Sequence, residues 1–400
     1  MSLSAKVAGI NPSPTLAITA KAKKMKSEGI DIIGFGAGEP DFDTPDHIKA
    51  AAIAAINEGF TKYTPSAGIL ALREAVANKL KRDNGLDYKA DEIIISCGAK
   101  HSLFNTMLAL FEEGDEIILP SPYWVTYPEQ IRLAGATAVI VDTKVENGFC
   151  LNPKDLQAKI TQRTKGIIIN SPNNPTGAVY DRKTLEAIAE IAVAKNIRVI
   201  SDECYEHLVY DNHKHYSIAA LGKEIKARTI VINAVSKTYS MTGWRIGYCA
   251  GSKDIVSAME NLQSQCTSNP CSIAQKAAVA ALNGPQDNLA VWQKEFAERR
   301  KIMVDGLNNI PGLVCPSPGG AFYVFPDWSK LRGYRTPAGQ VIENSGQMTD
   351  YLLDSAGVAL VPGGEFGAPD YLRLSYATSR QAIIEGVKRI GEAIAKLKQA

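Results

Sequence analysis

A regular alternation of short apolar runs and helical patterns between residues 92 and 250 constrains the fold more than any other feature of the sequence. Strand-like runs are expected at 92–96, 115–119, 137–141, 166–170, 197–201, 229–235 and 245–250. Helical patterns separate several of them, as at 101–112. Strands that alternate with helices favour a mostly parallel sheet with helices on both faces and ligands at the carboxyl ends of the strands. The sequence therefore predicts an α/β fold.

The segments on either side of this region indicate a second, smaller α+β unit. A long helical stretch at 253–309 contains expected breaks at 268–270 and 283–285. Short strands within 313–327, at 357–361 and at 371–376 then lead to a terminal amphipathic helix at 379–397. We expect an N-terminal arm at 1–45 that completes this small domain, a large domain at 46–294 and the rest of the small domain at 295–400.

Composition bounds the function classes. Four hundred residues with 45% hydrophobic content can form a large core, and 44 basic against 42 acidic residues give no reason to expect nucleic acid or a membrane surface as a partner. Seven cysteines without a C-x-x-C pair favour reduced thiols over a disulfide framework. No long apolar run or signal-peptide pattern stands out. A cytoplasmic enzyme is expected.

Lys237 is the candidate nucleophile. It lies on a turn of small residues between the strand patterns 229–235 and 245–250, and Arg245 begins the second of these. A lysine attacks only when its amine is deprotonated or already held as an imine, and a Schiff base with pyridoxal phosphate (PLP) meets that need. Arg245 could then bind the phosphate as a bidentate donor. Taken alone, the segment fits a solvated lysine better.

Polar motifs at other strand ends change that balance. Residues 171–177 (SPNNPTG) follow a strand directly, and Asp202 and Tyr205 lie one turn apart at the end of the next strand. Asp202 next to a pyridine nitrogen would keep that nitrogen protonated, although an N-capping role is the alternative. Residues 97–101 (CGAKH) form a strand-to-helix turn whose free amides could hold a phosphate.

Together these motifs resemble fold-type I PLP enzymes, specifically class I aminotransferases of the bacterial aspartate aminotransferase subgroup, which includes prephenate-using members. The resemblance covers nearly the whole chain through residues 37–42 (AGEPDF), 121–124 (SPYW), 173–177 (NNPTG), 201–203 (SDE), 241–247 (MTGWRIG) and 373–377 (RLSYA). It implies a large domain with a mostly parallel seven-stranded sheet flanked by helices, a smaller α+β domain, and a homodimer.

The resemblance also implies a role for each site residue. Lys237 would hold PLP and move the proton between substrate and cofactor. Asp202 would pair with the pyridinium, Asn174 and Tyr205 would bond the phenolate oxygen of the ring, and Trp124 would stack on it. The phosphate would be held by Arg245, by the amides of Gly98, Ala99 and Lys100, and by Tyr63 of the partner subunit. Arg373, with Gly38 and Asn174, would bind the substrate α-carboxylate.

A preference for a dicarboxylic amino donor requires a second cation besides Arg373. Residues 263–270 (QSQCTSNP), where other aspartate aminotransferases carry an arginine, contain none. Lys100 and Thr15 match the residues that the resembling subgroup uses for the distal carboxylate, although Lys100 could be a solvated lysine. Prephenate-using members carry a basic residue where this chain has Asn11. We therefore expect transamination of L-aspartate with 2-oxoglutarate and little prephenate activity.

Two alternatives stay open. An aromatic or kynurenine aminotransferase, or a carbon–sulfur lyase, would share the cofactor residues and differ in the distal pocket. A ligand-sensing regulator would need an added basic domain, for which the early start of the aminotransferase pattern leaves no room. His101, His207, His213 and His215 lack an evident supporting cluster, so no metal is expected.

Overall fold

The structure is a computed structural model that describes residues 4, 8–12 and 14–399, and its central feature is a seven-stranded sheet. The strands are β2 (Ile93–Ser96), β3 (Glu116–Ser121), β4 (Thr137–Asp142), β5 (Thr164–Asn170), β6 (Arg198–Asp202), β7 (Thr229–Ala234) and β8 (Gly247–Ala250). Their order is β2-β8-β7-β6-β5-β3-β4, and β8 runs antiparallel to both of its neighbours. The predicted mostly parallel sheet is confirmed.

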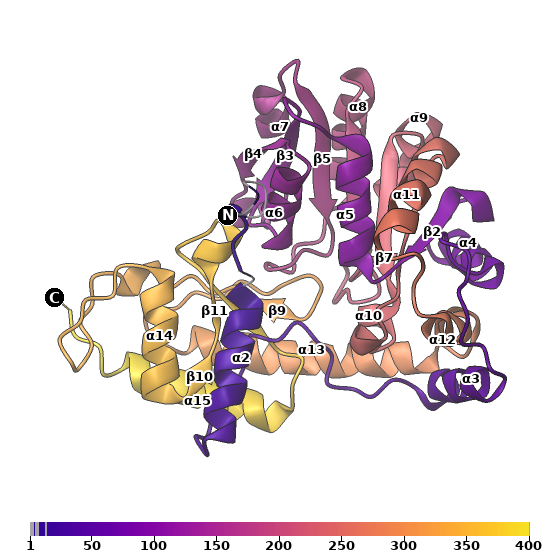
Figure 1. Ribbon diagram of the computed structural model, residues 1–400. Coiled ribbons are helices and arrows are strands. Elements are labelled where there is room, and N and C mark those ends of the chain that lie inside the picture. The colour runs from indigo at the N-terminus through magenta and orange to yellow at the C-terminus, as the bar shows by residue number, and fades with distance from the viewer. Residues whose placement is uncertain (1–3, 5–7, 13, 400) are drawn as a thin grey trace.

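Helices cover both faces of this sheet (Figure 1). The helices of the first half of the chain are α2 (Pro14–Ser27), α3 (Asp46–Asn57), α4 (Leu70–Asn84), α5 (Ala99–Leu110), α6 (Thr126–Leu133), α7 (Pro153–Lys159) and α8 (Arg182–Ala194). Those of the second half are α9 (Lys223–Lys226), α10 (Val235–Thr238), α11 (Lys253–Cys266), α12 (Ser272–Asn283), α13 (Asp287–Asn308), α14 (Ser345–Ala356) and α15 (Arg380–Ile394).

Alternating side chains of the central strands enter two different cores. Ile168 packs with apolar residues of α5, α6 and α11, whereas Ile167 and Ile169 pack with those of α7, α8 and α9. Because successive side chains of a strand point to opposite faces, a strand covered on both faces must be apolar throughout. This requirement explains the uninterrupted apolar run in β5.

The smaller unit contains two small sheets. A three-stranded antiparallel sheet has the order β11 (Val361–Pro362), β12 (Leu372–Ser375), β9 (Tyr323–Val324). In the other, β1 (Ile33–Gly34) pairs in parallel with β10 (Val358–Ala359), which confirms that the N-terminal segment contributes to this unit. In Figure 1, α13 crosses the lower part of the molecule from the side of α3 and α12 to that of α15. The predicted boundary at 294/295 falls inside α13, and the domain division stays a prediction.

The element boundaries differ modestly from the expected ones. The helical stretch from 253 is interrupted at both predicted breaks, between α11 and α12 and between α12 and α13. The region 313–327, where short strands are expected, is mostly irregular: β9 and isolated bridges at Val314, Gly320 and Asp327 form there. Prolines at 316 and 318 explain the interruption because proline has no amide hydrogen to donate to a sheet.

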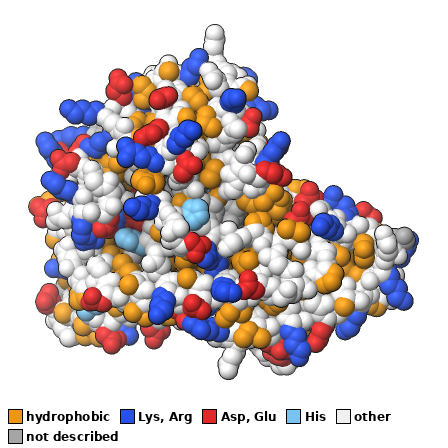
Figure 2. Space-filling model, turned by 180° about the vertical axis from the view of Figure 1, so that it is seen from behind, with side chains coloured by type: hydrophobic (Ala, Val, Ile, Leu, Met, Phe, Trp, Pro, Cys, Tyr) orange, Lys and Arg blue, Asp and Glu red, His pale blue; other side chains and the backbone are white. Residues whose placement is uncertain are grey.

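The topology brings the polar motifs to one edge of the sheet. Asn170 and Asp202 are paired residues at the carboxyl ends of β5 and β6, and Ala234 ends β7 beside them. On the face seen from behind the view of Figure 1, acidic and basic side chains are interspersed rather than gathered by sign (Figure 2). No helix of the described residues has both the length and the apolarity needed to cross a membrane.

Candidate active site

A cavity of about 350 Å³ lies at the carboxyl ends of the parallel strands. Its walls include all of the predicted site residues except Gly98 and Tyr63, namely Thr15, Gly38, Ala99, Lys100, Trp124, Asn174, Asp202, Tyr205, Lys237, Arg245 and Arg373. These residues come from segments spread over most of the chain, so the fold assembles in one place what the sequence only suggested separately.

Lys237 lies in the short helix α10, which begins directly after β7. Its Nζ donates a hydrogen bond of 2.6 Å to the carbonyl oxygen of Gly38. Burial lowers the pKa of Lys237 to about 8, and the positive charges of Arg245 and Arg373 act in the same direction, opposed by Cys204 and Glu39. A lysine with this pKa has a substantial neutral fraction near neutrality, as a nucleophile or a general base requires.

Asp202 is a buried carboxylate without a cationic partner among the described residues. Burial raises its pKa, and hydrogen bonds from Tyr127 and Cys204 oppose the rise. Tyr127 donates to Oδ2 at 2.7 Å, and the backbone amide of Cys204 donates to Oδ1 at 3.2 Å. The carboxylate is therefore held in a fixed position where a cationic ligand group would relieve its desolvation.

Arg245 and the start of α5 form the anion-binding end of the cavity. Arg245 has a left-handed backbone with φ 57° and donates to the carbonyl oxygens of Thr242 and Cys97 at 2.9 and 3.3 Å. At Gly98, φ is 87° and an added Cβ would lie 2.4 Å from the Arg245 guanidinium, so only glycine fits. The Gly98 amide donates to the carbonyl of Ser96, which leaves the Ala99 and Lys100 amides as the first donors of the helix.

Arg373 is 1% exposed and has no carboxylate partner among the described residues. Its guanidinium donates to Oδ1 of Asn174 at 3.0 Å and to the carbonyl of Gly36 at 2.7 Å, while its Nε has no partner. The Tyr323 ring lies 4.6 Å from the guanidinium carbon. Burial lowers the pKa of Arg373. A buried cation with spare donors and no counter-ion is a site for an anionic ligand.

Lys100 and Thr15 lie on another part of the cavity wall. The Lys100 ammonium lies 4.9 Å from the Trp124 ring centroid, and burial followed by the charge of Arg245 lowers its pKa. The buried hydroxyl of Thr15 has no hydrogen-bond partner among the described residues. Asn11 does not line the cavity, because its side chain donates to Oε1 of Glu129 at 3.2 Å.

Two residues considered in the sequence analysis, Tyr63 and His215, lie outside the cavity wall. Tyr63 is 90% exposed and does not line the cavity of its own chain. His215, for which the sequence showed no cluster, lies beside Glu203 and Glu206, and ligand atoms of the three are within 4.8 Å of one another.

Sequence reasoning missed two tyrosines in the cavity wall. Tyr127 lies one helical turn after Trp124, and this spacing could have indicated a shared face. Tyr323 shares a hydrogen bond of 2.8 Å with the Tyr205 hydroxyl, and its own hydroxyl would lie 2.5 Å from any Cβ at Gly38. Nothing in the apolar run around Tyr323 indicates this contact, because it joins residues 118 positions apart.

The chain matches a known protein family over most of its length. The model of the family "Aminotransferase class I and II" matches residues 30–390. The chain belongs to this aminotransferase family.

Relatives with assigned names agree with this classification. The aminotransferase is 52% identical to an aspartate aminotransferase of Geobacillus stearothermophilus, with 98% of each chain covered. It is 50% identical to a probable aspartate/prephenate aminotransferase of Aquifex aeolicus, with 99% of each covered. A crystal structure of the aspartate aminotransferase from Rhizobium meliloti superposes with a TM-score of 0.96, at 43% identity and over the whole of both chains.

This aminotransferase is PLP-dependent, as its family is, and the chemistry of the cavity suits that cofactor. Asp202 is a buried carboxylate that lacks a cation, which a pyridinium nitrogen would supply. Arg245 and the amides that begin α5 suit a phosphate, and a side chain at position 98 would close that end. Lys237 provides the amine.

Proposed function

We propose that this aminotransferase transfers the amino group of L-aspartate to 2-oxoglutarate, giving oxaloacetate and L-glutamate in a ping-pong cycle. Besides Lys237 and Arg245, which we assign to the cofactor, the cavity contains two further cations, Arg373 and Lys100. The observation that carries the proposal is that neither of these two pairs with a carboxylate of the described residues. A dicarboxylic substrate supplies one anion for each cation. The name of the 52% identical relative from Geobacillus stearothermophilus supports the same substrate.

The roles of the protein groups follow from their positions. Arg373 binds the α-carboxylate through its free donors, and Asn174 orients the guanidinium. Lys100, with the hydroxyl of Thr15, binds the distal carboxylate. Trp124 would stack on the ring of bound PLP, and Tyr205 would hydrogen-bond its phenolate oxygen; both residues line the cavity.

Proton transfer falls to Lys237. When PLP is bound, it withdraws electrons from the substrate Cα and carries the amino group between the two half-reactions. With a pKa of about 8, Nζ of Lys237 can take the proton from Cα and later return one, as a general base and then a general acid. Asp202 would hold the ring nitrogen of bound PLP, where a carboxylate favours the protonated nitrogen.

Substrate profiling tests the proposal. The values of kcat/KM for aspartate, glutamate and phenylalanine, each with a suitable amino acceptor, and for prephenate with a suitable amino donor, distinguish the substrate classes. We expect both dicarboxylic amino acids to exceed phenylalanine by at least about tenfold, since one charge-assisted contact contributes roughly 1.5–3 kcal/mol. A preference for phenylalanine would favour an aromatic aminotransferase, and efficient use of prephenate would favour the aspartate/prephenate class.

We also propose a cytoplasmic homodimer in which Tyr63 reaches the phosphate of the partner's cofactor. Exposed apolar residues occur on both sides of Tyr63, with Ile53 and Ile56 on α3 and Leu70 at the start of α4, which supports an interface there. All seven cysteines are free, which supports a reducing compartment.

Subunit mixing tests the shared site. Tyr63→Ala and Lys237→Ala proteins are each expected to lose most activity. If Tyr63 acts across the interface, a mixed dimer contains one site with both residues intact, and activity returns on mixing. Lack of recovery in dimers shown by sedimentation to exchange subunits would place Tyr63 outside the partner's site.

A further inference from the structure

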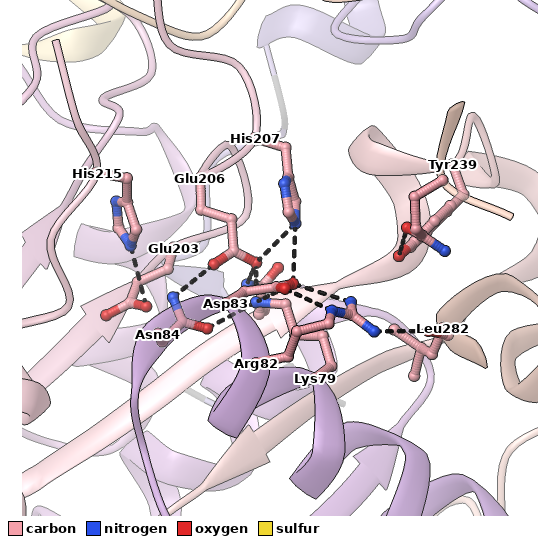
Figure 3. Close-up of polar contacts among 12 residues, drawn as sticks. Lys79, Arg82, Asp83, Asn84, Glu203, Glu206, His207, His215, Tyr239 and Leu282 are labelled. Carbon is pink, nitrogen blue, oxygen red and sulfur yellow. Dashed lines mark hydrogen bonds and ion pairs between the residues drawn. The ribbon is translucent and has the colours of Figure 1, made fainter. Parts of the chain in front are cut away.

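A buried polar cluster, most of which is labelled in Figure 3, takes no part in the chemistry described above. We define it by Lys79 and Asn84 of α4, Glu206 of the turn that follows β6, and Asn233 of β7. Lys79 is 2% exposed and Asn233 is 1% exposed. Charged groups are rarely buried without a functional or structural reason, because their desolvation opposes folding.

Glu206 contacts each of the other three residues of this cluster. Its carboxylate pairs with the Lys79 ammonium and accepts hydrogen bonds from Nδ2 of Asn84 at 2.8 Å and from Nδ2 of Asn233 at 2.6 Å. Burial alone would raise the pKa of Glu206, but the charge of Lys79, with smaller contributions from His207 and His215, holds it at about 2. The carboxylate is therefore ionised and fully engaged.

The neighbouring carboxylate does not turn the cluster into a metal site. Glu203, Glu206 and His215 place ligand atoms within 4.8 Å of one another, yet donors of the protein already engage both carboxylates. The hydroxyls of Ser201 and Ser217 donate to Oε1 of Glu203 at 2.8 and 2.6 Å. The Lys79 ammonium supplies the positive charge that a metal ion would otherwise bring to Glu206.

The bond from Asn233 to Glu206 joins the two segments that carry the catalytic groups. The turn that contains Glu206 begins directly after Asp202 and includes Tyr205. Asn233 lies four residues before Lys237, and its Oδ1 also accepts a hydrogen bond of 2.7 Å from the amide of Ala234, where β7 ends and α10 begins. Any displacement of this junction would move the amine of Lys237 relative to Asp202 and Tyr205.

We propose that Glu206, acting through Asn233, is a positioning residue of transamination. It fixes the position of the Lys237 amine relative to Asp202 and Tyr205. Lys79 keeps Glu206 ionised and in place. The influence on Lys237 is geometric, since the charges that act most strongly on the Lys237 amine are those of Cys204, Glu39, Arg245 and Arg373. The inference rests on the aminotransferase family and not on the identity of the amino donor.

The cluster itself supplies a matched pair of variants. Asn84 and Asn233 both donate an amide hydrogen to Glu206, but only Asn233 connects Glu206 to the junction before Lys237. We compare Asn233→Ala with Asn84→Ala in the holoenzyme, using any amino acid that the wild type accepts. The readouts are kcat, KM, the visible circular dichroism induced in bound PLP, which reports ring orientation, and the melting temperature.

The expected result is a selective effect. Asn233→Ala lowers kcat roughly 10- to 100-fold with little change in KM and alters the induced circular dichroism, because small displacements of reacting groups have effects of this size. Asn84→Ala keeps kcat and the spectrum within about twofold of wild type even where its melting temperature falls, because the two hydrogen bonds it removes, to Glu206 and from the Lys79 ammonium, do not involve the segment that carries Lys237. If Asn233→Ala does not fold, Asn233→Ser, whose side chain is too short to reach Glu206, serves in its place.

Two outcomes would overturn the proposal. One is an equal loss of kcat in the Asn84 and Asn233 variants, and the other is an unchanged spectrum and kcat on substitution of Asn233.

Discussion

The hydroxyl of Tyr127 donates a 2.7 Å hydrogen bond to Oδ2 of Asp202, and both side chains are buried. Tyr127 lies in α6 and Asp202 ends β6, so the contact joins a helix on one face of the sheet to a strand end. With the hydrogen bonds from Cys204, it opposes the rise in the pKa of Asp202 caused by burial. The position and the pKa of this carboxylate therefore depend on a residue outside the recognisable motifs.

Tyr127→Phe removes this bond with little change in shape. We expect kcat to fall roughly 10-fold at unchanged KM, because a hydrogen bond to a charged group contributes about 1.5–3 kcal/mol. Stopped-flow measurement of the aspartate half-reaction checks this, with Tyr123→Phe as a control on a neighbouring tyrosine that does not contact Asp202. An equal loss in both variants would mean that the Tyr127 hydroxyl has no special role.

Asp202→Asn should separate stability from function. Burial makes the pKa of Asp202 higher in the folded protein than in the unfolded chain. The carboxylate therefore begins to destabilise the folded state as pH rises through the unfolded-state pKa, and does so fully above the folded-state pKa. We expect the variant without cofactor to melt at a higher temperature than wild type at neutral pH. With PLP it should lose roughly 2–5 kcal/mol of transition-state stabilisation. A variant with lower melting temperature and normal half-reaction rates would refute both parts.

Lys237 should be the residue that carries the cofactor. Borohydride reduction of the holoenzyme followed by peptide mass mapping is expected to place the added mass on the peptide that contains Lys237. Lys237→Ala should retain its fold but lack both the reduced adduct and the visible absorption band with added PLP. Lys100→Ala is the control, because Lys100 lines the same cavity. An adduct on Lys100 in the Lys237→Ala protein would exchange the two assignments.

The amine of Lys237 should react with a pH midpoint near 8 in the protein without cofactor. Its pKa is lowered, so the neutral amine is favoured in the folded state and its fraction grows as pH rises through 8, whereas the unfolded chain needs a pH near the ordinary lysine value of about 10.4. Competitive labelling with acetic anhydride, read by mass spectrometry, gives the midpoint. Glu39→Gln should lower the midpoint, because Glu39 raises the pKa. A midpoint near 10 would contradict this environment.

Lys100→Ala tests which anion Lys100 binds. Loss of one charge-assisted contact should lower kcat/KM for aspartate and glutamate by roughly 1.5–3 kcal/mol, about ten- to a hundredfold, and leave phenylalanine almost unchanged. Steady-state kinetics with the three amino acids measure this. An equal decrease for all three would assign Lys100 to the cofactor alone.

Local features of the sequence are enough to predict much of this protein. Short, uninterrupted apolar runs located all seven strands of the large sheet, and turn residues located the breaks around α12, because both signals act over a few residues. Asp202 and Lys237 became candidate site residues for the same reason, because each lies within two residues of the end of a strand pattern. Residues at the carboxyl ends of parallel strands converge in any sheet of this kind.

Contacts between distant segments were decided only by the tertiary structure. Tyr127 meets Asp202 across 75 residues of sequence, Tyr205 meets Tyr323 across 118, and Lys79 meets Glu206 across 127. No local period encodes such pairs, because each depends on how a helix packs against a strand end and on which polar groups that packing leaves buried. For the same reason the sequence could suggest Arg373 as an anion site, but only the packed structure shows that its buried guanidinium has no carboxylate partner among the described residues. The chain thus carries its strands, turns and reactive residues in short-range patterns, whereas the geometry that makes them a site arises from packing.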